Sequence, residues 1–201
     1  MRAVLEVPRG CGRERKLSGG LPPLCGGITI FTTRRKRTRI AFWLTVILLL
    51  DQSTKLAVDH LLPLHHSIVV VEGWMDLIHV RNTGAAFGLL AGQRRALGSY
   101  VLIVFSLIAI AFIIQLLRRL SETDAGLTLS LTFILGGAFG NLVDRVLYGE
   151  VIDFIDVYWN RYHWQAFNVA DGFITIGAVL CLFCLLFTKG RDPFSPGRAT
   201  D

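Results

Sequence analysis

The sequence lacks the short motifs that mark several common enzyme classes. It has no H-E-x-x-H run for a metallopeptidase zinc site and no G-x-S-x-G run for an elbow-type serine hydrolase. His65 and His66 are adjacent, and neighbouring side chains on a strand point to opposite faces, so they make a poor metal-binding pair. We expect neither a metal nor another cofactor.

Cysteine is scarce, and its placement argues against a disulfide framework. Of the four cysteines, Cys181 and Cys184 lie inside an apolar block, where they act as small apolar residues. Cys11 and Cys25 lie in a Gly-rich segment that we expect to be cytoplasmic and reduced.

The long apolar blocks lack the polar stripe that a soluble amphipathic helix carries. Apolar residues make up 52% of the chain, and its mean hydropathy is +0.52. A helix needs roughly 20 residues to cross a hydrocarbon core. Four blocks reach that length, at about 40–60, 98–117, 126–147 and 168–188. The sequence therefore predicts an all-α polytopic membrane protein with four transmembrane helices.

The net charge of +6 does not indicate nucleic-acid binding, because the basic residues flank the apolar blocks. Arg118 and Arg119 follow the second block, and Lys189 follows the fourth. A larger basic cluster precedes the first block: Arg34, Arg35, Lys36, Arg37 and Arg39. With four spans these positions share one side, which the positive-inside rule makes cytoplasmic. Arg94 and Arg95 oppose this orientation but are outnumbered.

The flanking segments predict a simple domain organisation. Residues 1–38 show no helix or strand period, so we expect a disordered, basic, cytoplasmic extension. No small-residue cleavage site follows the first apolar block, which therefore reads as an uncleaved span. Residues 39–189 would form the membrane domain, and 190–201 a cytoplasmic tail.

Two connections should lie on the outer side of the membrane. In residues 63–97, two β-rich runs, 68–71 and 75–80, flank Glu72 and Gly73 and predict a short hairpin. The connection at about 148–167 is rich in tyrosine and tryptophan, which settle at the boundary between membrane and water.

Ionisable residues inside the spans cost roughly 2.5–3.5 kcal/mol each on insertion scales, so each needs a reason. Asp51 and Lys55 are four positions apart and share one face of a helix, where they could simply neutralise each other. Asn141, Asp144 and Arg145 end the third block, where helix termination and snorkelling of the arginine are the alternative explanation.

The topology also brings two further aspartates to one boundary. Asp153 follows the third span and Asp171 begins the fourth, so both flank one outer connection at similar depth. Two carboxylates close together in a low dielectric cannot both ionise easily, and one keeps a proton. Such a pair can activate water with one member and protonate a leaving group with the other. Helix capping or pairing with arginine would also account for these residues.

Five short runs resemble the signatures of lipoprotein signal peptidase, also called signal peptidase II, in the family's order and spacing. They are Asp51-Gln52-Ser53-Thr54-Lys55, residues 82–88 (NTGAAFG), residues 136–145 (GGAFGNLVDR), Val151-Ile152-Asp153-Phe154-Ile155 and Phe167-Asn168-Val169-Ala170-Asp171. Residues 1–38 match none of the family core; they are either a regulatory tail or a consequence of the start site.

The resemblance implies a bacterial inner-membrane aspartic peptidase with a small extracytoplasmic β-element and an active site at the outer-leaflet interface. It would cleave lipid-modified prolipoproteins just before the diacylglyceryl cysteine, using Asp153 and Asp171 as the catalytic pair. We expect substrate and membrane lipid as partners, no nucleic acid, and a monomer. The supporting residues would be Asp51, Lys55, Asn82, Asn141, Arg145 and Asn168.

Two other classes of function remain as alternatives. A proton-coupled transporter would use Asp51, Lys55 and the outer aspartates as a relay, but it would need ionisable residues spread across the depth of the membrane. The second and fourth spans carry none beyond Asp171. A non-catalytic assembly subunit would tolerate replacement of Asp153 and Asp171.

Overall fold

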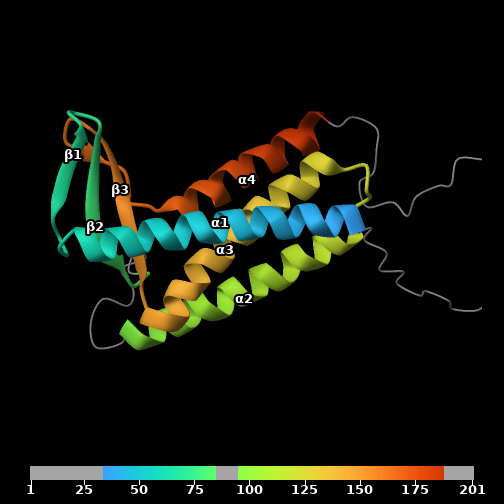
Figure 1. The fold of residues 1–201 in the computed structure, drawn as a ribbon, viewed down its shortest axis with the longest axis horizontal. Helices are drawn as coiled ribbons and strands as arrows, with labels where there is room; N and C mark the ends of the chain where they lie inside the picture. The colour runs from blue at the N-terminus through green and yellow to red at the C-terminus, as the bar shows by residue number, and fades with distance from the viewer. Residues whose placement is uncertain (1–33, 85–94, 188–201) are drawn as a thin grey trace, which may run out of the picture.

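The fold is a bundle of four long helices with a small antiparallel sheet at one end (Figure 1). We describe residues 34–84 and 95–187 from a computed structural model. The helices are α1 (Arg34–Leu61), α2 (Arg95–Arg119), α3 (Ala125–Tyr148) and α4 (Val169–Phe187). The strands are β1 (Ser67–Val71), β2 (Met75–Asn82), β3 (Val151–Trp159) and β4 (Tyr162–His163).

All four helices are long and apolar enough to cross a membrane, as the sequence predicts. Their outward faces carry large apolar side chains; Phe105 and Phe112 of α2, for example, are 66% and 63% exposed. Apolar surface on this scale is rare on soluble monomers, whereas lipid is its natural solvent. The predicted spans thus match the observed helices to within a few residues at most boundaries.

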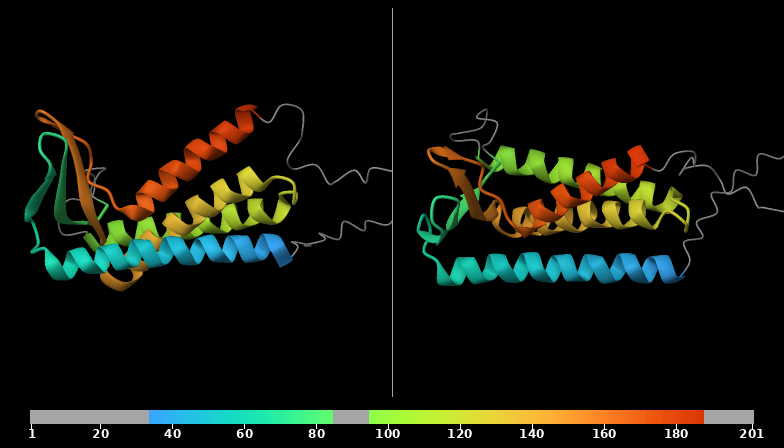
Figure 2. Two further views of the ribbon diagram at one scale, coloured as in Figure 1. Left: turned by 45° about the horizontal axis from the view of Figure 1, so that its top comes forward. Right: turned by 90° about the horizontal axis from the view of Figure 1, so that it is seen from above.

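Helix α3 forms the centre of the bundle, with α1, α2 and α4 arranged around it (Figures 1 and 2). Leucines of α3, including Leu127, Leu131 and Leu135, pack against Ile110 and Ile113 of α2. Towards α1 and α4 the contacts are closer because α3 presents glycines there. A Cβ on Gly136 would meet Ile47 of α1, and one on Gly137 would meet the backbone oxygen of Ala170 in α4.

The G-x-x-x-G spacing at Gly136 and Gly140 therefore serves close helix packing. A Cβ on Gly140 would meet the Asp51 carboxylate, so the same stripe of glycines also admits a polar group between α1 and α3.

The sheet has the order β1-β2-β3-β4, with all neighbours antiparallel. The predicted hairpin is present as β1 and β2. The sequence predicts no strand at residues 151–159, which lie within the expected aromatic connection. They form β3, the longest strand, and β3 pairs with β2, so that the two outer connections make one sheet. Gly149, at φ 76°, ends α3 and turns the chain into β3.

The start of α1 corrects a second expectation. Residues 34–38, assigned to the disordered extension, are helical. Lys36 is buried there, and its Nζ donates to the backbone oxygens of Leu117 (2.9 Å) and Leu120 (2.7 Å). These oxygens lie in the last turn of α2 and just after it, where backbone oxygens have no partners within the helix, so a basic side chain satisfies them. The rest of the predicted N-terminal extension, residues 1–33, and the predicted C-terminal tail, residues 190–201, lie outside the described part of the chain.

A methyl group added at Gly137 tests the close approach of α3 and α4. The Gly137→Ala variant should lower the free energy of unfolding by roughly 1–3 kcal/mol, because the new Cβ overlaps the Ala170 carbonyl. Thermal unfolding in detergent measures the change. Gly172→Ala in α4 is the control: nothing lies within 4 Å of its Cβ, so helix propensity alone predicts equal or slightly higher stability. Equal melting temperatures for both variants would contradict this account of the packing.

Candidate active site

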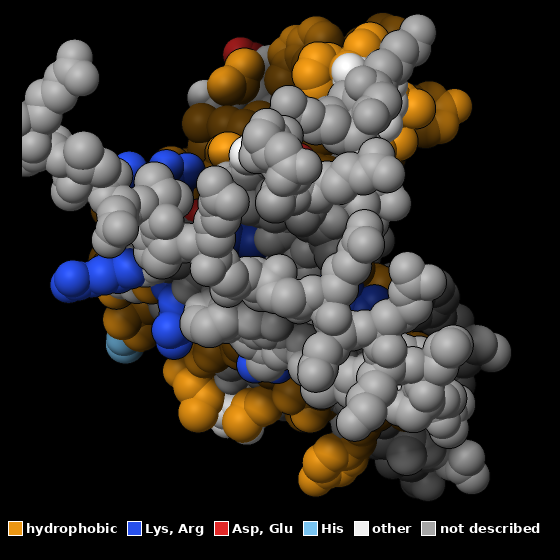
Figure 3. All heavy atoms as spheres, turned by 90° about the vertical axis from the view of Figure 1, so that its right-hand side faces the viewer, with side chains coloured by type: hydrophobic (Ala, Val, Ile, Leu, Met, Phe, Trp, Pro, Cys, Tyr) orange, Lys and Arg blue, Asp and Glu red, His pale blue; other side chains and the backbone are white. Residues whose placement is uncertain are grey.

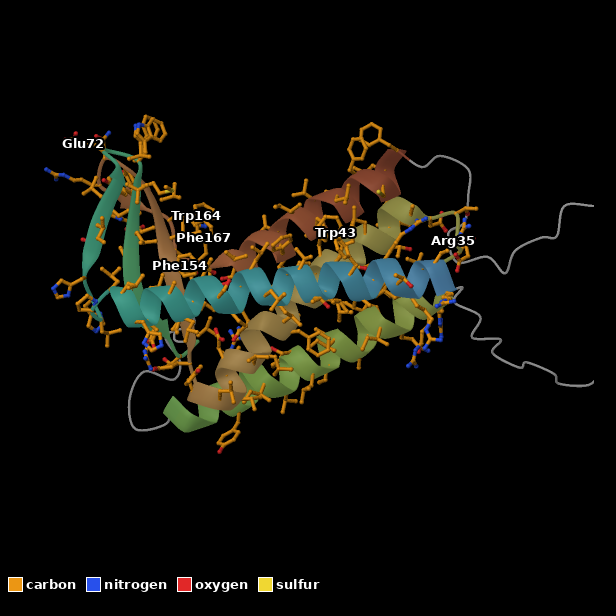
Figure 4. All side chains as sticks on the ribbon, viewed as in Figure 1. Arg35, Trp43, Glu72, Phe154, Trp164 and Phe167 are labelled. Atoms are coloured by element: carbon orange, nitrogen blue, oxygen red, sulfur yellow. The ribbon has the colours of Figure 1, made fainter. Side chains whose placement is uncertain are left out.

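Asp153 and Asp171 line one cavity at the junction of the sheet and the helices. The cavity has a volume of about 680 Å³. Its polar wall includes Asn82, Asn141 and Arg145 beside the two aspartates. Its apolar wall comes from α2, α4 and the segment before α4, with Leu102, Ile176, Trp164 and Phe167. Trp164 and Phe167 lie between the sheet and the start of α4 (Figure 4).

Asp153 is held by two side-chain amides. It lies on β3 and is 2% exposed. Asn82 Nδ2, from the paired strand β2, donates to its Oδ2 at 2.9 Å, and Asn168 Nδ2 donates to its Oδ1 at 2.7 Å. Burial raises the pKa of Asp153 to about 6; the amide hydrogen bonds oppose this rise and the nearby charge of Asp171 adds to it.

Asp171 is held by a capping box at the start of α4. Asn168 precedes the first residue of the helix, and its Oδ1 accepts from the backbone N–H of Asp171 at 3.1 Å. In return Asp171 Oδ2 accepts from the backbone N–H of Asn168 at 3.4 Å. Asn141 Nδ2 donates to Asp171 Oδ1 at 2.8 Å. A negative charge in the first turn of a helix is also stabilised by the helix dipole.

Lys55 lies behind the cavity as the centre of a buried ionic cluster. Its Nζ contacts Asp51 Oδ2 at 2.8 Å, Asp144 Oδ2 at 2.7 Å and Asn141 Oδ1 at 3.0 Å. Asp51 Oδ1 in turn accepts from the backbone N–H of Ala170 at 2.9 Å. The expected pairing of Asp51 with Lys55 is therefore present, but it also joins α1 to α3 and α4.

The polar end of α3 faces inward. Asn141 and Asp144 are buried, and Arg145 is half-buried at the cavity wall, where its Nη1 donates to the backbone oxygen of Asn141 at 3.2 Å. Helix termination alone therefore does not account for these residues. All eight predicted site residues belong to one connected network, which also includes Asp144.

Gln52 is a member of this network that the sequence analysis did not single out. Its Nε2 donates to Asp144 Oδ1 (2.9 Å), Asp51 Oδ2 (3.1 Å) and the Gly140 oxygen (3.3 Å). Gln52 lies inside the first of the five runs, and this position is the feature of the sequence that could have identified it. No cluster of ligands suited to a metal ion occurs within residues 34–84 and 95–187.

Comparison with known proteins places this geometry in a family. The family described as "Signal peptidase (SPase) II" matches residues 43–187. The chain belongs to the signal peptidase II family. A lipoprotein signal peptidase of Desulforapulum autotrophicum is 41% identical over 158 residues, covering 79% of this chain and 98% of that protein. One of Geobacter metallireducens is 46% identical over 149 residues, covering 73% of this chain and 90% of that protein.

The fold comparison agrees with the sequence comparison. A solved structure described as a bacterial membrane enzyme, at 2.3 Å resolution, superposes with a TM-score of 0.67 and 25% identity. The match covers 80% of this chain and 95% of that one. This signal peptidase II is thus a hydrolase of lipoprotein processing and a multi-pass bacterial membrane protein.

Removing the Lys55 charge tests the ionic cluster. The Lys55→Met variant of this signal peptidase II should lose roughly 3–5 kcal/mol of stability, because Asp51 and Asp144 would remain buried without their cation. Thermal unfolding in detergent gives the change. Adding Asp144→Asn to Lys55→Met should recover part of the loss, since it removes one uncompensated charge. A double variant less stable than Lys55→Met alone would contradict this electrostatic explanation.

The pKa of Asp153 predicts how stability depends on pH. Its value of about 6 in the folded protein exceeds the value of about 3.9 in an unfolded chain. The folded state therefore holds the proton more tightly, and Asp153 weakens the fold as pH rises through this interval. The stability of Asp153→Asn relative to wild type should increase between about pH 4 and about pH 7, by no more than about 3 kcal/mol.

The change with pH is the relevant measurement, because the new amide also disturbs the bonds to Asn82 and Asn168 by an amount that does not depend on pH. Melting temperatures of both proteins across the interval provide it. The control is Glu72→Gln, an exposed residue at the tip of the sheet away from the bundle (Figure 4). A constant difference for Asp153→Asn would refute the raised pKa.

Proposed function

We propose that this chain is an aspartic endopeptidase that removes signal peptides from diacylglyceryl-modified prolipoproteins. Cleavage would occur just before the lipidated cysteine, with Asp153 and Asp171 as the catalytic pair. The observation that carries the proposal is the position of both carboxyl groups on the wall of one cavity, each held by side-chain amides. Side-chain amides do not act as acids or bases, so the two aspartates are the groups in that wall suited to acid–base chemistry on a peptide bond.

The surroundings of the two aspartates favour different roles. Asp153 is the more deeply buried, and its raised pKa makes it the member that retains a proton. Asp171 lies at a helix N-terminus with backbone and side-chain donors, an environment that favours negative charge. We assign Asp171 as the base and Asp153 as the acid.

In the first step Asp171 removes a proton from water, and the water oxygen bonds to the scissile carbonyl carbon. Asp153 protonates the carbonyl oxygen, which gives a tetrahedral intermediate. In the second step the bond between carbon and nitrogen breaks, the leaving amine takes up the proton held by Asp171, and the hydroxyl proton returns to Asp153 as the carboxylic acid forms. The Arg145 guanidinium, on the same wall, is placed to stabilise negative charge on the carbonyl oxygen.

The apolar wall suits a substrate that is partly lipid. Leu102 on α2 and Ile176 on α4 both contribute to the cavity. Both belong to helices with lipid-facing surfaces, so acyl chains could remain in the bilayer while the peptide bond reaches the aspartates.

We also propose that the sheet and the catalytic pair face the outer side of the membrane and that both termini are cytoplasmic. Lys and Arg side chains gather at the opposite end of the bundle, where α1 begins and α2 ends (Figure 3). Exposed aromatic residues, among them Trp159, Tyr162 and Trp164, lie at the sheet end. We propose a monomer, since one chain supplies every group of the network.

The test is cleavage of a purified diacylglyceryl-modified prolipoprotein in detergent. Wild type should cut before the lipidated cysteine, whereas Asp153→Asn and Asp171→Asn should fold yet fall to background, because Asn preserves shape without acid–base function. Asp156→Asn is the matched control: it lies on the same strand, on the opposite face, and bonds to His163 rather than the cavity. Turnover close to wild type in either dyad variant would show that residue to be structural. An inactive wild type on a validated substrate would favour a transport or assembly role instead.

A further inference from the structure

Arg81 forms a bridge between β2, α1 and the turn that precedes β3. Its Nη2 donates to Asp59 Oδ1 at 2.6 Å, and its Nη1 donates to Glu150 Oε1 at 3.1 Å. Asp59 lies in the last turn of α1, and Glu150 lies between the end of α3 and the start of β3. One guanidinium thus fixes β2 to α1 and to the residue just before β3.

The bridge lies where β2 most needs support. A bulge between Leu77 and Val80 interrupts the pairing of β2 with β3. Beyond the bulge only three pairs remain, Val80 with Asp153, Arg81 with Ile152, and Asn82 with Val151. Strand ends held by so few pairs open readily. Asn82 is the last residue of β2, so its position depends on this short ladder.

Asn82 must be oriented as well as placed. Its Oδ1 accepts from the backbone N–H of Gly84 at 2.8 Å, and this turns its Nδ2 towards Asp153. Side chains of adjacent strand residues point to opposite faces, so Arg81 anchors the far side of the backbone that carries Asn82. The Arg81 guanidinium therefore acts on Asp153 through the adjacent residue, Asn82.

We infer that Arg81, with Asp59 and Glu150, is a positioning residue that holds Asn82 against the catalytic Asp153. The inference rests on the proposed role of Asp153. The two carboxylate partners raise the pKa of Arg81 above the usual value, so the guanidinium keeps its charge. His79 Nε2 lies 3.5 Å from the same Asp59 oxygen, so this histidine is the other titratable group facing the bridge.

The inference predicts a loss of turnover in Arg81→Met. Loosening Asn82 should lower kcat roughly 10- to 100-fold with little change in KM, since a small misplacement at the reacting groups is costly while the substrate-binding walls remain. Arg81→Lys should retain one of the two ion pairs and give an intermediate loss. The control is Arg161→Met, an exposed arginine in the turn between β3 and β4 that forms no ion pair within the described residues.

The pH profile separates positioning from general loosening of the fold. The hydrogen bond from Asn82 lowers the pKa of Asp153, so weakening it should move the alkaline limb of the kcat profile to higher pH. Asn82→Ala should move the limb in the same direction. Arg81→Met with an unmoved limb would mean that Arg81 does not act on Asp153.

A double-variant cycle decides whether Arg81 acts through Asn82. If it does, Arg81→Met combined with Asn82→Ala should turn over about as fast as Asn82→Ala alone. Independent, multiplicative losses would overturn the inference even if Asp153 and Asp171 prove catalytic. If turnover by Asn82→Ala is too slow to measure, the position of the alkaline limb in the kcat profile of Arg81→Met alone decides whether Arg81 acts on Asp153. Full activity in Asp153→Asn would instead overturn the proposed function, so the two failures are distinguishable.

Discussion

The buried ammonium of Lys55 is the interaction on which the rest of the site depends. A charge at this depth has no water to solvate it, so its three N–H groups need protein acceptors. Asp51, Asp144 and Asn141 supply them. These contacts determine the orientation of the Asn141 amide. Because its Oδ1 is turned to Lys55, its Nδ2 points the other way and donates to Asp171. The same logic holds for Asn168 and Asn82, whose oxygens accept backbone N–H groups and whose NH₂ groups therefore face Asp153. Three amides are thus oriented as donors towards the two carboxylates.

Such a network requires the helices to approach one another closely, and α3 provides this through small residues. Gly137 and Gly140 leave room for the Ala170 backbone and the Asp51 carboxylate. The approach allows Asp51, on α1, to accept the Ala170 N–H that begins α4. The start of α4 is consequently capped twice, by Asp51 from another helix and by Asn168 from its own N-terminus. A helix terminus tied in this way holds Asp171 in place without relying on the loop before it.

The sequence predicts the parts of this architecture whose signals are local or are dictated by the solvent. The four spans follow from apolar length, the β1–β2 hairpin from β-rich runs around Glu72 and Gly73, and the meeting of Asp153 with Asp171 from topology. Strand β3 was missed because its sequence does not alternate between apolar and polar residues and lies in a segment rich in aromatic side chains, although Val151, Ile155 and Val157 carried a β signal. The start of α1 was misplaced because a run of arginines resembles a solvated flank, and Lys36 finds its acceptors only on a helix that is distant in sequence. The Arg81 bridge is equally non-local, since its partners lie 22 and 69 positions away.

The membrane also contributes to the chemistry, because it limits how much charge the network can carry. Asp51, Asp144, Asp153 and Asp171 are opposed within the network by Lys55 and Arg145 alone. Lys55 contacts Asp51 and Asp144 directly, which leaves Arg145 as the cation that shares the cavity wall with the proposed catalytic pair. Full ionisation of both aspartates would then exceed the positive charge available in a low dielectric, so retaining one proton on the pair lowers the electrostatic energy. Burial near the end of the bundle thus favours the asymmetric, singly protonated pair that the proposed mechanism requires. In the proposed orientation the cavity lies at the outer boundary of the membrane, where water, the second reactant, is available.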